Sequence, residues 1–197
     1  MQVIFCRLLN SSGMRFKGRK TGIFTICCLA LYYGVAYWLP ASNSFFLGKV
    51  SKNFRAFLCG HIFLHCGKGV NVERKANFGC GLGVELGDES GLGVGCVVPS
   101  DTRIGNYVMM GPNCRILHQN HNFGRTDIPM CHQGLGPKLP TVIEDDVWIG
   151  RDVLITPGRV IRKGSIVGCG CVLSKDFPEY SIIGGNPPRL IRSRLPG

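Results

Sequence analysis

The chain has 197 residues, enough for one domain with a substantial core and an appended segment. Its net charge of +11 lies almost wholly in the first third, where residues 1–75 hold eleven Lys and Arg against the single acid Glu73. Residues 76–197 hold the remaining twelve basic residues and eleven acids. This N-terminal excess favours an anionic lipid surface, whereas the lack of a basic stripe interleaved with aromatic residues argues against nucleic-acid binding.

The eleven cysteines do not form a recognisable zinc or disulfide framework, because their number is odd and none lies in a CxxC pair. We expect free, reduced thiols that are buried as small hydrophobic side chains. This favours a cytoplasmic protein, associated with the inner face of the membrane. Because Met14 would be a natural start, residues 1–13 are expected to be an unstructured extension.

Residues 22–39, GIFTICCLALYYGVAYWL, carry no charge and follow a basic cluster within residues 15–20. Eighteen apolar residues are the shortest stretch that usually spans a bilayer. A span, a helix lying in the membrane interface and a helix packed on its own core are the alternatives. We expect membrane association through residues 15–55 rather than a span. A signal peptide is disfavoured because no small-x-small cleavage site is evident.

Residues 49–65 predict an amphipathic helix that caps the following domain. Its expected apolar face comprises Val50, Phe54, Phe57, Leu58, Ile62 and His65. His61 and His65 lie on or near that face, and we expect them to be packing residues without a function. Residues 1–65 together form the basic N-terminal region.

Residues 66–185 contain two ladders of side chains with a period of six. The ladder of large residues is Leu86, Leu92, Val98, Ile104, Met110 and Ile116, resuming at Ile143, Ile149, Ile155, Ile161, Val167 and Leu173. The ladder of smaller residues is Val72, Phe78, Val84, Ser90, Cys96, Thr102, Val108 and Cys114, resuming at Val147, Val153, Arg159, Ser165 and Cys171. This period predicts an all-β coil of three short strands per turn, stacked as parallel strands. Glycine after the large residue is expected to relieve the corner backbone.

The repeat is interrupted between Ile116 and Ile143, whose spacing of 27 (143 − 116) is not a multiple of six. The sequence therefore predicts a loop over about residues 118–141 that leaves the rigid coil. Long loops on rigid scaffolds often carry function.

Three segments resemble the hexapeptide-repeat acyltransferases: VMMGPNCRILHQNHNF, VIEDDVWIGRDVLITPG and GSIVGCGCVLSKDFPEYSIIGGNPPRLIRSR. Within that family they are most similar to the galactoside and maltose O-acetyltransferases and to the capsular or exopolysaccharide O-acetyltransferases. The resemblance covers about residues 66–194. It implies a left-handed parallel β-helix, a homotrimer with active sites between subunits, and direct transfer of acetyl from acetyl-CoA to a hydroxyl.

The resemblance places His121 at the family's catalytic histidine. An alcohol that attacks a thioester must lose its proton, and a histidine general base is worth about 10²–10⁴ in rate. Asp127, Asp145 and Asp146 remain alternatives for the group that orients the imidazole. A backbone N–H could stabilise the oxyanion.

His118 competes with His121 for the role of base, and we expect it to be a flanking residue. A zinc site formed by His118, His121 and His132 would follow the γ-class carbonic anhydrases, which share the β-helix. We do not expect a metal, because these residues lack a recognisable ligand pattern.

The resemblance also implies contacts with the acyl donor. The matching positions are Arg151, Cys169, Ser174, Lys175, Arg189 and Arg192, and cationic side chains suit the phosphates of coenzyme A. Residues 186–197 are expected to form a C-terminal helix and tail, so Arg189 and Arg192 could equally be solvated helix residues. Trp148 and Asp127 are the expected substrate contacts, with packing at a corner as the alternative for Trp148.

One segment departs from the sugar-acetylating relatives, which often present an Asn toward the acceptor where this chain has DESGLG at residues 88–93. Ser90 lies on the ladder and should point inward. The predicted function is O-acetylation of a sugar hydroxyl, in capsular or exopolysaccharide modification, on an acceptor such as a lipid-linked saccharide. The alternatives are an N-acyltransferase on an amino sugar, a serine acetyltransferase, or a non-catalytic trimeric scaffold.

Overall fold

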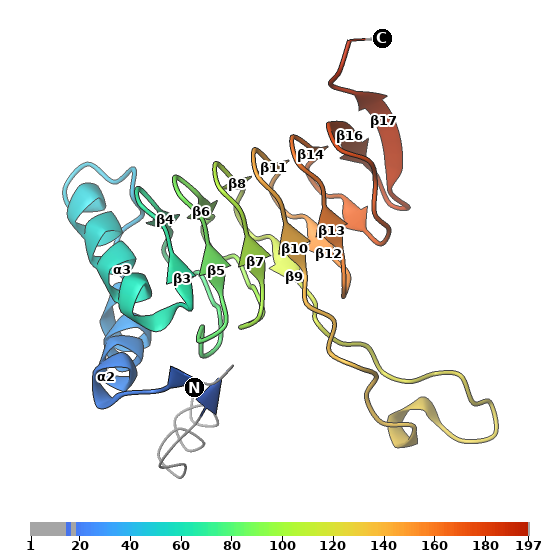
Figure 1. The fold of residues 1–197 in the computed structure, drawn as a ribbon, viewed down its shortest axis with the longest axis horizontal. Helices are drawn as coiled ribbons and strands as arrows, with labels where there is room; N and C mark the ends of the chain where they lie inside the picture. The colour runs from blue at the N-terminus through green and yellow to red at the C-terminus, as the bar shows by residue number, and fades with distance from the viewer. Residues whose placement is uncertain (1–14, 17–18, 197) are drawn as a thin grey trace.

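The computed structural model describes residues 15–16 and 19–196, which form a helical cap, a triangular β-coil, a projecting arm and a C-terminal hairpin (Figure 1). Before the cap, β1 (Arg15–Phe16) pairs antiparallel with β2 (Arg19–Lys20). The expected extension over residues 1–13 lies outside the described residues.

The coil, called the prism below, has three faces of parallel strands, and its first turns contribute only the bridge residues Asn77 and Val97 to the third face. Face 1 comprises β3 (His65–Cys66), β5 (Glu85–Leu86), β7 (Arg103–Ile104), β10 (Val142–Ile143) and β13 (Val160–Ile161). Face 2 comprises β4 (Asn71–Val72), β6 (Gly91–Leu92), β8 (Met109–Met110), β11 (Trp148–Ile149), β14 (Ile166–Val167) and β16 (Ser181–Gly184). Face 3 comprises β9 (Arg115–Ile116), β12 (Leu154–Ile155) and β15 (Val172–Leu173).

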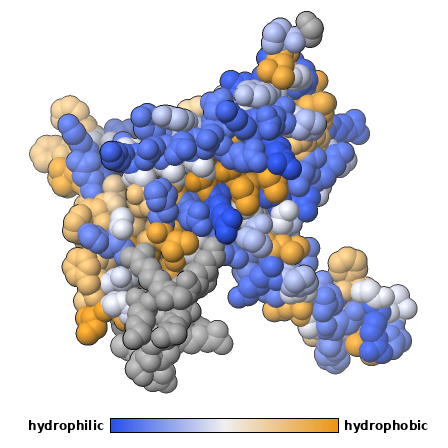
Figure 2. All heavy atoms as spheres, in the orientation of Figure 1, coloured by the Kyte–Doolittle hydropathy of each residue, from blue (hydrophilic) through white to orange (hydrophobic). Residues whose placement is uncertain are grey.

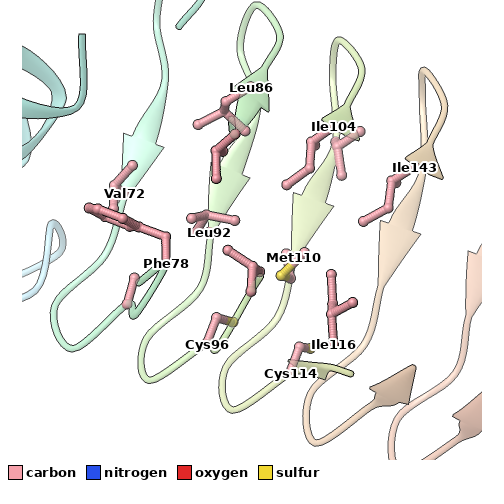
Figure 3. Close-up of a cluster of buried hydrophobic side chains, with 14 of the residues drawn as sticks. Val72, Phe78, Leu86, Leu92, Cys96, Ile104, Met110, Cys114, Ile116 and Ile143 are labelled. Atoms are coloured by element: carbon pink, nitrogen blue, oxygen red, sulfur yellow. The ribbon is translucent and has the colours of Figure 1, made fainter. Parts of the chain in front are cut away.

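The two predicted ladders fill the interior of the prism, as Figure 3 shows for one part of it. All of their members are buried except Arg159, whose guanidinium turns to the Pro157 and Ser174 carbonyls at a corner. Ser90 points inward as predicted, donating to the Gly105 carbonyl at 2.7 Å and accepting from the Val108 N–H at 2.9 Å. The period of six therefore corresponds to one face of the coil, with buried side chains recurring on each successive face.

The corner glycines serve a purpose other than the predicted one. Gly111 and Gly150 do not adopt a positive φ, so backbone relief at the corner is not their role. A Cβ placed on Gly111 would lie 2.7 Å from the Arg151 nitrogen, and one on Gly150 would lie 2.7 Å from the Cys169 nitrogen. Glycine is required here because successive coils approach too closely for a side chain.

The apolar segment 22–39 folds as α2 (Ile23–Leu31), which continues into a π-helical turn, η1 (Tyr32–Ala36). Its inner side packs on the prism, where the Tyr32 hydroxyl donates to the Ala76 carbonyl and the Tyr33 hydroxyl to the Gly79 carbonyl, each at 2.8 Å. Among the described residues, none of the helices combines the length and apolarity that crossing a bilayer would require.

The predicted amphipathic helix is α3 (Gly48–Ile62), but its buried face differs from the expected one. Val50 and Phe57 are exposed, whereas Arg55 is fully buried. Arg55 occupies an inward position because its guanidinium reaches the Val72 and Pro40 carbonyls, so the contact with the first coil includes polar bonds beside the buried Leu58 and Ile62. His61 packs edge-on against two phenylalanine rings as a packing residue would, but His65 lies exposed on β3.

The predicted C-terminal helix is wrong, because β17 (Arg189–Ser193) folds back antiparallel onto β16. Gly185 has a φ of +92° and is followed by Pro187 and Pro188, so the chain reverses instead of starting a helix. β16 itself pairs in parallel with β14, which makes the hairpin a continuation of face 2.

All ten cysteines within the described residues are free, as predicted. Burial raises the pKa of the Cys66 thiol to about 11, which keeps it protonated and unreactive. Cys27, Cys131 and Cys169 are exposed, however, because they lie on the outer side of α2, on the arm and at a prism corner rather than on the ladders. The prediction of general burial is wrong for these three.

Candidate active site

The arm, residues 117–141, projects from the corner between faces 3 and 1 (yellow in Figure 1). Its neck is fixed to the prism by the Leu117 N–H donating to the Ile155 carbonyl at 2.8 Å and the Gly158 N–H donating to the Leu139 carbonyl at 3.1 Å. Beyond the neck the chain forms a twisted hairpin and a short 3₁₀ turn, η2 (Met130–His132). The predicted loop is therefore a hydrogen-bonded hairpin that is anchored to the prism at its neck.

His121 lies on the first strand of this hairpin, where it forms an antiparallel bridge with Leu135. Backbone hydrogen bonds on either side join Gly136 to Asn120 at 2.9 Å and Asn122 to Gly134 at 3.0 Å. The His121 side chain is exposed, and it makes no side-chain hydrogen bond within the described residues. The backbone at His121 is thus held firmly while its imidazole is accessible to a ligand.

The three candidate orienting carboxylates are each engaged elsewhere in the chain. Asp127 forms a bidentate pair with Arg125, whose guanidinium holds the pKa of the Asp127 carboxyl below its ordinary value. Asp145 accepts from the Asn106 N–H at 2.7 Å, and Asp146 lies 3.2 Å from the Arg194 guanidinium. Within one chain, none of the three orients the His121 imidazole.

Four of the six expected coenzyme A residues gather toward the end of the prism that carries the C-terminal hairpin. Arg151 and Cys169 occupy the same corner on successive coils, where the Gly170 N–H donates to the Arg151 carbonyl at 2.9 Å. Both Arg189 and Arg192 lie on β17; Arg189 pairs with Gly184 at the end of β16 beside that corner, and Arg192 pairs with Ile182 farther from it. Three exposed cations therefore lie at one end of faces 2 and 3.

Ser174 and Lys175 follow β15 and lie at the other edge of face 3, the same corner from which the arm leaves. Both are exposed, and the Lys175 ammonium is 5.4 Å from the centroid of the Phe177 ring. The structure places these two near the arm and separates them from Arg151 and Cys169 by the width of face 3.

Trp148 lies on β11 of face 2, between Met109 and Ile166 on the neighbouring coils. Half of its surface is exposed, at 50%, and Met109 beside it is 61% exposed. Trp148 therefore lies on a strand of face 2 rather than at a corner, and its contact with a substrate stays a prediction. Face 2 instead presents an apolar wall to solvent.

The single chain does not bring all candidate residues together. His121 and Asp127 lie on the arm, Trp148 on face 2, and the cations at both edges of face 3. The alternative zinc site was to be formed by His118, His121 and His132. Within residues 15–16 and 19–196, no three His, Cys, Asp or Glu side chains are grouped as metal ligands.

Two glutamines that shape the arm were not among the predicted site residues. The Gln133 side chain donates to the Arg125 carbonyl at 2.7 Å and accepts from the Arg125 N–H at 3.0 Å, which closes the tip. The Gln119 amide donates to the Gly136 carbonyl at 2.6 Å beside His121. No signal in the sequence distinguishes them, because a glutamine in a loop is usually a solvated residue.

No protein-family model matches the chain. An acetyltransferase homologue of Schizosaccharomyces pombe is 33% identical over 123 residues, which are 61% of this chain and 58% of that protein. The galactoside O-acetyltransferase of Escherichia coli K12 is 28% identical over 144 residues, 70% of this chain and 68% of that protein. The chain thus spans less than two thirds of the length of the first of these relatives.

A solved galactoside acetyltransferase in complex with coenzyme A superposes with a TM-score of 0.71 at 25% identity, covering 86% of this chain and 80% of that one. This likeness identifies the prism as a left-handed parallel β-helix of hexapeptide repeats, as the resemblance implied. The chain is therefore similar to hexapeptide-repeat acetyltransferases, with galactoside O-acetyltransferases among its sequence and structural relatives.

Proposed function

We propose that the protein is an acetyl-CoA-dependent O-acetyltransferase that acts on a sugar hydroxyl, with His121 as the general base. One observation carries the proposal: His121 lies on a hydrogen-bonded rung of an arm anchored to a rigid β-helix. Its relatives add support, because they include a galactoside O-acetyltransferase and a neighbour solved with coenzyme A.

The proposed step needs no covalent enzyme intermediate. The acceptor hydroxyl oxygen attacks the thioester carbonyl carbon while His121 takes the hydroxyl proton. When the tetrahedral intermediate collapses, the C–S bond breaks, and the leaving coenzyme A thiolate takes the proton back from His121. The products are an acetyl ester and free coenzyme A, so atoms and charge balance.

We further propose a homotrimer in which the arm of one copy reaches face 2 of its neighbour. In a single chain the arm and face 2 each expose large apolar side chains to solvent. These side chains are Phe123, Met130 and Leu135 on the arm, and Trp148 and Met109 on face 2. Apposing them would place His121 near Trp148. It would also bring the base toward Arg151, Arg189 and the other cations proposed to hold coenzyme A.

The first test measures thiol release from acetyl-CoA with a panel of saccharide acceptors. Wild type should give acceptor-dependent release, and His121→Ala should lower it by about 10² or more. His118→Ala is the matched control and should stay near wild type. Equal activity of wild type and His121→Ala would move the base elsewhere, and no release or coenzyme A binding at all would favour a scaffold.

A second test addresses the shared site. His121→Ala and Trp148→Ala chains are unfolded together, refolded as a mixture, and compared with each variant refolded alone. If one chain supplies His121 and its neighbour Trp148, the mixture regains part of the wild-type rate. A mixture as inactive as its components, with an assembly mass equal to the 21.5 kDa of one chain, would contradict the trimer.

The acceptor distinguishes the remaining alternatives. We propose a saccharide of capsular or exopolysaccharide assembly, carried on lipid at the inner face of the membrane. The product of an amino-sugar acceptor separates oxygen from nitrogen transfer, because hydroxylamine cleaves an ester and leaves an amide intact. An amide product would favour the N-acyltransferase alternative, and activity on serine would favour a serine acetyltransferase.

A further inference from the structure

The cap, made of α2, η1, α3 and the loop between η1 and α3, covers the end of the prism opposite the C-terminal hairpin (Figure 1). Its inner side is buried through Cys28, Leu29, Tyr32 and Ala36. Its outer side faces away from the prism (Figure 1).

The outer side of α2 and η1 is apolar along its whole length. Phe24, Leu31 and Val35 recur at helical spacing there, together with Ile23, which is 82% exposed. The uncharged segment thus presents apolar side chains on both sides, one toward the prism and one toward solvent. A helix that is apolar all round needs a second cover.

The second half of this surface comes from α3 and the loop before it. Phe45 is fully exposed and Phe46 is 87% exposed, and Val50 and Phe57 continue the surface along α3. Phe57 and Phe24 meet through His61, whose ring lies 4.7 Å and 5.0 Å from theirs. The two helices therefore share exposed apolar side chains, and Figure 2 shows apolar residues among hydrophilic ones at the left end of the molecule. Exposed apolar patches often mark interaction sites.

The charge around this surface identifies the occupant. Lys49 and Lys52 lie on α3 beside Val50, and the Lys75 ammonium lies 5.7 Å from the centroid of the Trp38 ring. Within residues 21–75 the single acid, Glu73, is paired with the buried Arg55. Two copies facing each other through this surface would appose like charges, whereas an anionic bilayer complements them.

We propose that the cap is a membrane-docking surface that inserts Phe45, Phe46 and the outer side of α2 among anionic lipids. Exposed aromatic residues ringed by lysines suit the interface between head groups and acyl chains. In the proposed side-by-side trimer the prism ends stay uncovered, so three caps would face one membrane. The inference rests on the proposed function only for the identity of the acceptor, because docking would hold the active sites near a lipid-linked saccharide.

Vesicle flotation of the full chain tests the proposal without any acetyl transfer, so its outcome is independent of the catalytic assays. Wild type should float with phosphatidylcholine vesicles containing phosphatidylglycerol, and less with phosphatidylcholine alone. The double variant Phe45→Ser/Phe46→Ser should lose roughly tenfold or more in partitioning. Tyr107→Ser, which replaces an exposed aromatic residue on the prism away from the cap, should float like wild type.

Three results would overturn the proposal. Wild type could remain unbound with both vesicle types, or the double variant could float like wild type while its circular dichroism is unchanged. A lower assembly mass for the double variant would instead assign the surface to contacts between copies. Binding that rises when residues 1–13 are deleted would assign it to the chain's own N-terminus.

Discussion

The buried Arg55 gives the sharpest quantitative prediction, because it joins the cap to the first coil. Its guanidinium donates to the Val72 carbonyl at 2.5 Å and the Pro40 carbonyl at 3.0 Å, and lies 3.6 Å from the Glu73 carboxylate. Methionine fills much of the same volume but donates no hydrogen bond. Arg55→Met therefore leaves two carbonyls and one carboxylate without their cationic partner.

The expected loss of unfolding free energy is about 3 kcal/mol. A buried polar group left unsatisfied costs about 1–3 kcal/mol, and breaking a buried ion pair about 3–5 kcal/mol. The lower end of the ion-pair range applies because, in Arg55→Met, Glu73 keeps hydrogen bonds from the Ser42 N–H at 3.0 Å and the Asn71 amide at 3.1 Å. Such a loss is a large share of a typical total of about 5–15 kcal/mol.

Urea unfolding followed by circular dichroism measures this loss. Arg115→Met is the matched control, because Arg115 is an exposed arginine on β9 and should change stability by less than about 0.5 kcal/mol. The double variant Arg55→Met/Glu73→Gln should recover part of the loss by removing the unpaired carboxylate. A loss below about 1 kcal/mol, or one that the control reproduces, would refute the assignment of Arg55 as the polar anchor.

Three further predictions concern pH, packing and the acyl donor. Burial would raise the pKa of the Glu73 carboxyl, but hydrogen bonds from Ser42 and Asn71 hold this pKa below its usual value. The stabilisation that Glu73 contributes is therefore present above its pKa in the unfolded chain and is lost as the pH falls through its pKa in the folded protein. Acid titration of wild type and of Glu73→Gln should show this loss of stability only in wild type. Gly111→Ala should cost about 1–3 kcal/mol in urea unfolding, because the added Cβ would lie 2.7 Å from the next coil. Gly124→Ala, which meets nothing within 4 Å, should be near neutral. Lys175→Gln should raise the KM for acetyl-CoA about tenfold with little change in kcat. Lys68→Gln, at the other end of the prism, is the control and should change neither constant. Equal KM values for the two variants would show that Lys175 is not part of the donor site.

The prism could be predicted in detail because its period is a direct record of its geometry. Each residue such as Leu86 or Ile149 stacks on the residue one full coil away, so a single periodic pattern specifies strand, face and interior at once. The C-terminal helix and the face of α3 were mispredicted for the opposite reason. Arg55 is buried by carbonyls far away in sequence, and β17 forms because β16 offers an unpaired edge.

The candidate site was only partly predictable. The resemblance supplied His121 and the donor residues by position, and the structure shows which of them share a corner and which do not. Sequence could not reveal that Asp145 is engaged by Asn106 or that Gln133 closes the arm, because both depend on contacts between segments. The proposed juxtaposition of His121 with Trp148 lies beyond one chain, since His121 is on the arm and Trp148 is on face 2.

The internal bonding of the arm separates the position of His121, the proposed base, from the tip of the arm. His121 lies on the hairpin, and main-chain hydrogen bonds fix the neck of the arm to the prism at the corner that also carries Lys175. The tip is held by Gln133 and by the pair of Arg125 and Asp127, none of which contacts the prism. Under the proposed function, substitutions at the tip should therefore change which hydroxyl is presented, whereas His121 stays where the neck places it.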